Sequence, residues 1–171
     1  MNDKKGAVTR MNDLKARFNY QFAGPNIGIS VSNGWLTVFE GLCSDIDALL
    51  GEDKRGFHWV QCKEKYGTAR FYYELENAKP GTRIDVISAK GLLSIKTDPK
   101  GSEGLDTLKQ LDALVEAAED KIKTLCYVCG EPATLDRSTG WILTLCSRHS
   151  EARAADRKAF MDELNEINGA T

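Results

Sequence analysis

The sequence lacks long apolar runs and a marked excess of charge of either sign. No stretch of about 18 consecutive apolar residues, the length that spans a membrane, occurs among its 171 residues, and residues 1–5 contain no apolar signal core. We therefore expect a soluble, cytoplasmic protein instead of a membrane or secreted one. The 23 basic and 25 acidic residues give a net charge of −2. This balance is typical neither of a basic nucleic-acid-binding protein nor of an acidic DNA mimic.

Residues and motifs that catalysis uses are also scarce. The chain has two histidines, His58 and His149, and it contains no phosphate-binding P-loop, no dinucleotide-binding glycine motif and no nucleophile elbow. His58 lies in a β-favouring stretch without an evident nucleophile or carboxylate partner. We therefore expect a protein that is not an enzyme.

The cysteines are more informative than the histidines. Their number is five, and an odd number argues against a disulfide scaffold. Cys126-x2-Cys129 and Cys146-x2-His149 are two ligand pairs separated by 16 residues, the spacing of a tetrahedral zinc site. A dithiol redox motif would use the first pair and leave the second unexplained. We predict a structural Zn²⁺ site whose four ligands leave no position open for water or substrate.

The residues around these ligands resemble a treble-clef zinc finger. Gly130 suits a knuckle with positive φ after the second thiol. Residues 133–136 and 141–145 are predicted to be short strands joined by a polar turn, and residues 147–167 a helix that carries the last ligand in its first turn. HNH-type nucleases share this order but need histidines near the hairpin, where this chain has none. Such a nuclease, dependent on His58, is the least favoured interpretation.

Hydrophobic spacing predicts an α+β fold for the whole chain. Apolar residues recur at intervals of three and four in residues 34–50 and again in residues 105–124, which indicates two amphipathic helices. Aromatic and β-favouring residues flank Tyr66-Gly67, so residues 57–64 and 69–75 are predicted to form a hairpin. The expected architecture is a helix plus β-hairpin core, with a long second helix leading into the treble-clef-like zinc module and a C-terminal helix.

The tip of this hairpin combines basic and aromatic side chains. They are Lys63, Lys65, Tyr66, Arg70 and Tyr72. Such residues can hold single-stranded nucleic acid by charge and stacking, or they can anchor a protein interface. A solvated turn above an aromatic core is the alternative without function. Because the chain is not basic overall, we favour a protein partner over nucleic acid.

Two groups of motifs occur together in this chain. The first is Lys63-Glu64-Lys65-Tyr66-Gly67 with Arg70-Phe71-Tyr72-Tyr73, and the second is Cys126-x2-Cys129-Gly130 with Gly140-Trp141-Ile142-x-Thr144-Leu145-Cys146-x2-His149. Over about residues 34–75 and 105–150, the chain resembles a family of small, mostly uncharacterised bacterial and bacteriophage proteins. The resemblance implies no activity. It implies an accessory protein in a bacterial cell that binds and modulates or inhibits a host protein complex, such as a defence system. The alternative is a nucleic-acid-binding zinc-finger protein.

These patterns divide the chain into three parts. Residues 1–32 are polar and interrupted by glycine, and we expect a partly ordered N-terminal arm. Residues 33–125 form the α+β core, in which residues 78–103 are an insertion relative to the family pattern and contain two short strands. Residues 126–171 form the zinc module, docked on the core because the long helix runs directly into Cys126.

Overall fold

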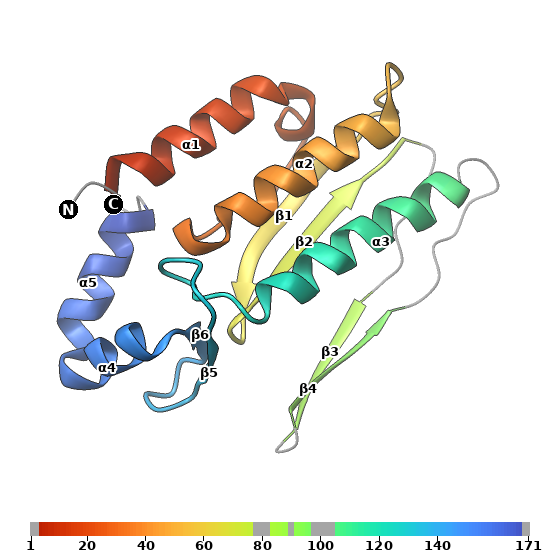
Figure 1. Cartoon of the computed structure of the whole chain (residues 1–171). Helices are drawn as coiled ribbons and strands as arrows, with labels where there is room; N and C mark the ends of the chain where they lie inside the picture. Colours follow the sequence, from red (N-terminus) through yellow and green to blue (C-terminus); the bar gives the residue numbers. More distant parts are fainter. Residues whose placement is uncertain (1–3, 77–82, 89–90, 97–104, 169–171) are drawn as a thin grey trace.

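A computed structural model describes residues 4–76, 83–88, 91–96 and 105–168 of the chain. Its fold class is α+β, as predicted (Figure 1). The elements are α1 (Lys4–Arg17), the 3-10 turns η1 (Asn19–Phe22) and η2 (Asn33–Trp35), α2 (Leu36–Leu50), β1 (His58–Lys65), β2 (Thr68–Glu74), β3 (Arg83–Ser88), β4 (Gly91–Lys96), α3 (Leu105–Ile122), β5 (Thr134–Asp136), β6 (Leu143–Leu145), α4 (Ser147–Ala155) and α5 (Arg157–Asn168).

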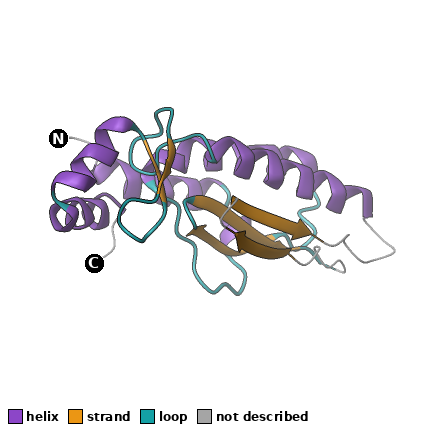
Figure 2. Cartoon of the chain, turned by 90° about the horizontal axis from the view of Figure 1, so that it is seen from below, coloured by secondary structure: helices purple, strands orange, loops and turns teal. Residues whose placement is uncertain are grey.

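The core lies between the β1–β2 hairpin and a helical layer that includes α2 and α3 (Figure 2). Successive side chains of a strand point to opposite faces, and the inward face of this hairpin is aromatic. The Phe39 ring on α2 lies 5.4 Å from that of Trp59 and 5.0 Å from that of Phe71. All three side chains are buried, so the apolar stripe of the first predicted helix packs on the predicted hairpin.

The turn of this hairpin has the predicted two-residue form. Tyr66 and Gly67 both have positive φ, at 56° and 78°. Two consecutive positive φ values give a turn whose twist matches that of the flanking strands. The turn fixes the register in which Lys65 lies opposite Thr68.

The N-terminal residues differ from the partly ordered arm that we expected. They form α1 and η1, and Ala7, Leu14 and Phe18 are buried against the rest of the chain. Farther along, the Ile27 N–H donates to Val60 O (2.9 Å) and the Ser30 N–H to Cys62 O (2.8 Å). The chain therefore covers the outer edge of β1. Three apolar residues among many charges gave only a weak helical signal in the sequence.

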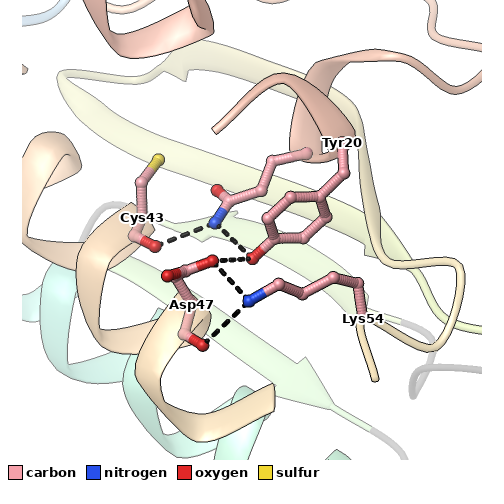
Figure 3. Close-up of polar contacts among 5 residues, drawn as sticks. Tyr20, Cys43, Asp47 and Lys54 are labelled. Carbon is pink, nitrogen blue, oxygen red and sulfur yellow. Dashed lines mark hydrogen bonds and ion pairs between the residues drawn. The ribbon is translucent and has the colours of Figure 1, made fainter. Parts of the chain in front are cut away.

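A polar network attaches η1 to α2 and β1, and Figure 3 shows its contacts with α2. The Gln21 side chain donates to Cys43 O (2.8 Å) and accepts from the Trp59 indole N–H (3.2 Å). Tyr20 OH donates to Asp47 Oδ1 (3.0 Å). Burial, with the adjacent Asp47, raises the pKa of Tyr20 to about 12, so the hydroxyl stays a donor at neutral pH.

Replacing Gln21 with leucine is expected to lower the free energy of unfolding by about 2 kcal/mol, because it removes the acceptor of a buried indole N–H. Urea unfolding measures this change. Tyr20→Phe is the control, since it removes one half-buried hydroxyl and is expected to lower that free energy by about 1 kcal/mol or less. An unchanged midpoint for Gln21→Leu would show that the network adds nothing to stability.

The two strands expected within the insertion are present. β3 pairs with β4 in antiparallel register, with Arg83 opposite Lys96 and Ser88 opposite Gly91. Residues 78–82, 89–90 and 97–103 of the insertion lie outside the described residues. In Figure 1 this second hairpin stands apart from β1–β2.

The C-terminal helix is two helices and not the single one predicted. Asp156 has extended backbone (φ −146°, ψ 95°) between α4 and α5, and its Oδ1 accepts from the Ala159 N–H (3.0 Å). A carboxylate at this position caps the second helix. Phe160, Leu164 and Ile167 on α5 are buried, whereas Ala152 and Ala155 on α4 are exposed. α5 packs beside α1, so the first and last helices lie side by side (Figure 1).

Candidate functional site

The four predicted metal ligands converge in the structure. Cys126 and Cys129 lie in the loop after α3, Cys146 directly precedes α4, and His149 is in the first turn of that helix. Their ligand atoms all lie within 4.8 Å of one another. Within the described residues, this is the one group of three or more His, Cys, Asp or Glu side chains close enough to share an ion.

The distances between these atoms fit a tetrahedral metal ion. Metal–sulfur bonds of about 2.3 Å and metal–nitrogen bonds of about 2.0 Å place sulfurs about 3.8 Å apart and sulfur about 3.5 Å from nitrogen. The Sγ atoms of Cys129 and Cys146 are 3.9 Å apart. His149 Nδ1 lies 3.4, 3.5 and 3.1 Å from the Sγ atoms of Cys126, Cys129 and Cys146. The cluster can therefore hold one metal ion with protein ligands alone.

The backbone around the cysteines favours metal binding by their sulfurs. Gly130 has φ +78°, and its N–H donates to Cys126 O (2.9 Å), which closes the knuckle. The backbone N–H of Glu131 donates to the Cys129 sulfur and that of His149 to the Cys146 sulfur. Such bonds stabilise thiolates, the form that binds metals.

The pKa shifts of the residues in the cluster also bear on metal binding. Burial is the main cause that lowers the pKa of His149, and Arg148 lowers it further, so the imidazole is neutral at pH 7. Burial raises the pKa of Cys129 to about 11. For Cys146, burial raises the pKa, but the His149 backbone N–H and the neighbouring thiols outweigh it and the net shift is downward. A cation that binds here would displace protons from the thiols that still carry them.

Contacts with η2, the turn that directly precedes α2, hold the knuckle on the core. The Gly34 N–H donates to Tyr127 O (3.1 Å) and the Trp35 indole N–H to Leu125 O (3.1 Å). The Asn33 side chain donates to Val128 O (3.1 Å). The loop that carries Cys126 and Cys129 therefore packs as one unit with η2, which leads into α2.

A second set of contacts joins the module to the β1–β2 turn. The Thr144 hydroxyl donates to Gly67 O (2.6 Å). The Trp141 indole N–H donates to Glu64 Oε2 (3.1 Å), and Glu64 Oε1 accepts from the Gly67 N–H (2.6 Å). Burial raises the pKa of Glu64, although the bonds from Gly67 and Trp141 oppose this shift. The turn and the β5–β6 hairpin thus share one surface.

Arg153 fixes the β5–β6 hairpin to α4. It is fully buried, its guanidinium donates to Trp141 O, and its Nη1 lies 3.6 Å from Asp136 Oδ2. The same Asp136 oxygen accepts from the Ser150 hydroxyl (3.0 Å). The β5–β6 hairpin therefore covers the face of α4 that carries Arg153.

The five predicted partner-binding residues do not share one environment. Tyr66 is exposed at the turn, while Lys63, Lys65 and Tyr72 are half-buried. The ammonium of Lys63 lies 5.6 Å from the centre of the Tyr72 ring, and that of Lys65 lies 5.5 Å from the Tyr66 ring. We call these four side chains the hairpin tip.

Arg70 corrects the sequence-based prediction. Its side chain is 0% exposed, and Nη1 donates to Thr68 Oγ1 (2.6 Å) and to Ala69 O (2.7 Å). As a residue of the predicted binding surface, it was expected to be accessible to a partner. A buried guanidinium bonded to its own strand cannot contact a partner, so Arg70 is a structural residue.

Two surface residues beside the tip were not predicted. Leu135 on β5 and Trp141 before β6 are exposed, although the sequence analysis used both only as strand-forming residues. The sequence did contain a signal for the exposure of Trp141. This tryptophan directly follows Gly140 in a polar turn, where the core does not usually cover a large apolar side chain.

His58 lies at the other end of the hairpin from the Cys/His cluster. It pairs with Glu74, at the end of β1–β2 that is farthest from the turn. Its Nδ1 lies 3.1 Å from Gly56 O and its ring packs so tightly on Gly24 that a Cβ there would come within 2.0 Å. The nuclease interpretation needed this histidine near the module, and the geometry gives it no support.

No family model matches this chain, and no curated protein or solved structure is significantly similar to it. Among the helices of the described residues, none combines the length and apolar character needed to cross a bilayer.

Proposed function

We propose that this chain is a non-enzymatic binding protein stabilised by one structural Zn²⁺ ion. The observation that carries the proposal is the Cys126, Cys129, Cys146 and His149 cluster, in which three sulfurs and one imidazole nitrogen converge at tetrahedral distances. Three thiolates with one imidazole are a common donor set of structural zinc. With four protein ligands, no position is left for a reacting water or substrate.

The function of the metal is then to hold a binding surface. The module that it folds contacts the β1–β2 turn through Thr144 and Trp141, beside the hairpin tip. We propose that the partner is a host protein or protein complex. In this proposal the protein is a phage or bacterial accessory factor that modulates or inhibits that complex in the bacterial cytoplasm, a defence system being one example. Aromatic side chains next to cations favour a protein interface.

The experiment is an affinity pull-down from bacterial lysate with zinc-loaded protein, with and without nuclease treatment. A stoichiometric protein partner that survives the nuclease is expected. The double variant Lys63→Glu and Lys65→Glu should recover at least tenfold less of it, because it reverses two charges at the hairpin tip. Lys109→Glu with Lys121→Glu is the matched control, since both lysines are exposed on α3. Equal recovery by both double variants would remove the hairpin tip as the binding site.

Nucleic-acid binding is the alternative, because lysines beside aromatic rings also suit single strands. It predicts that the captured material is lost on nuclease treatment. It also predicts that affinity for an oligonucleotide falls steeply with salt. A flat salt response, or no complex in a gel shift, would exclude this alternative.

A further inference from the structure

Large apolar side chains gather where the hairpin tip meets the metal module. Five are exposed in the described part of the chain: Val8, Ile27, Tyr66, Leu135 and Trp141. Tyr66, Leu135 and Trp141 are 38%, 45% and 39% exposed. A Cβ on Gly67 would lie 2.7 Å from the Leu135 side chain, and Trp141 shares Glu64 with the Gly67 N–H. The three side chains therefore surround one turn, and we call them the junction surface.

Tyr66 has a backbone conformation that aromatic residues rarely adopt. Its φ of 56° lies in the left-handed region, which asparagine and glycine adopt more readily than an aromatic residue. The residue is 38% exposed, so part of its ring faces solvent. A strained residue that presents an aromatic side chain to solvent is typical of a functional site.

The charge around the junction surface is positive. Lys63 and Lys65 lie on β1, and the exposed Arg137 follows β5. Glu64 lies between Lys63 and Lys65 on β1. Its two carboxylate oxygens accept from the Gly67 and Trp141 N–H groups. A partner with carboxylates would therefore complement this surface.

We propose that the junction surface binds a protein segment in which a large apolar side chain is flanked by carboxylates; this inference rests on the proposed function. Leu135 is aliphatic and cannot stack on a base. One face of each tyrosine ring, Tyr66 and Tyr72, already has a lysine ammonium over it. These features suit an apolar anchor with acidic neighbours better than a stacked single strand.

The test uses a display library of random peptides, selected on the zinc-loaded full chain. We expect enriched peptides to carry an aromatic or branched apolar residue between Asp or Glu residues. Selection on Lys63→Glu with Lys65→Glu should replace those acidic flanks with Lys or Arg. Leu135→Ser should weaken the best peptide at least about tenfold, the effect of removing an interface anchor. Ile27→Ser, which removes an exposed apolar side chain elsewhere, should not weaken it.

Tyr66→Asn separates a binding role from a structural one. Asparagine accepts positive φ, so the melting temperature should stay the same or rise, while peptide affinity falls about tenfold. A loss of stability with unchanged affinity would overturn the assignment of Tyr66.

Three outcomes overturn the proposal: no enriched peptides, peptides whose flanks do not respond to the lysine reversal, or selective binding of an oligothymidine at the same residues. If Leu135→Ser still captures the partner found by pull-down, the proposed function stands and the junction surface fails. If pull-down finds no partner, the proposed function itself fails.

Discussion

Replacing Cys129 with serine is expected to unfold the C-terminal third of the protein. The change removes one of four ligands, and the apparent binding free energy of structural Zn²⁺ is about 10–16 kcal/mol in small zinc modules. That range is comparable to the whole stability of a typical domain, about 5–15 kcal/mol. We expect the metal content to fall from one ion per chain to well below one, and the melting temperature to fall by about 10 °C or more.

Elemental analysis and thermal unfolding followed by circular dichroism measure these two effects. Cys43→Ala is the control, because Cys43 is a buried thiol outside the cluster. It should keep one metal per chain and lose about 1 kcal/mol of stability through a small cavity. A Cys129→Ser protein that kept its metal, or that lost it with unchanged unfolding, would contradict a structural role for the ion.

Replacing Gly34 with alanine is expected to separate the knuckle from the core. A Cβ at this position would lie 2.0 Å from Cys126 O, 2.7 Å from Gly130 N and 2.8 Å from Tyr127 O. These are backbone atoms of the ligand loop, so they cannot move aside as a flexible side chain can. We expect the free energy of unfolding to fall by about 3 kcal/mol, and metal affinity to fall because Cys126 must shift.

Urea unfolding and competition with a chromophoric zinc chelator measure the two consequences. Gly41→Ala is the matched control, because Gly41 is exposed inside α2 with nothing within 4 Å of the added Cβ. That change should stabilise the protein by about 0.5–1 kcal/mol, since alanine favours the helix. If Gly34→Ala stabilised the protein in the same way, the close contact between η2 and the knuckle would be contradicted.

The ligand set and the β1–β2 hairpin could be predicted because each depends on a local pattern. The two ligand pairs have the spacing of a turn around one ion, and the structure brings all four together. Tyr66-Gly67 between β-favouring runs predicted the turn that the positive φ values now show. Residues next to one another in the chain determine such features.

Predictions that depended on what covers a side chain were wrong. Arg70 was expected to contact a partner and Arg153 had no predicted role, and both are fully buried. An arginine is normally exposed, and its own sequence neighbours do not reveal which distant segment packs over it. The break at Asp156 was missed for a related reason, because the charged run around it is compatible with a continuous helix.

The sequence by itself determined the α+β class, the turn and the four members of the Cys/His cluster, because periodicity, turn residues and Cys/His spacing act over short distances along the chain. Only the tertiary structure decided which polar side chains are buried and which apolar ones are exposed. Gly34 meets Cys126, and Gly67 meets Leu135, across large gaps in sequence. Contacts of that kind depend on how separate elements pack, and they create the junction surface that no single segment contains.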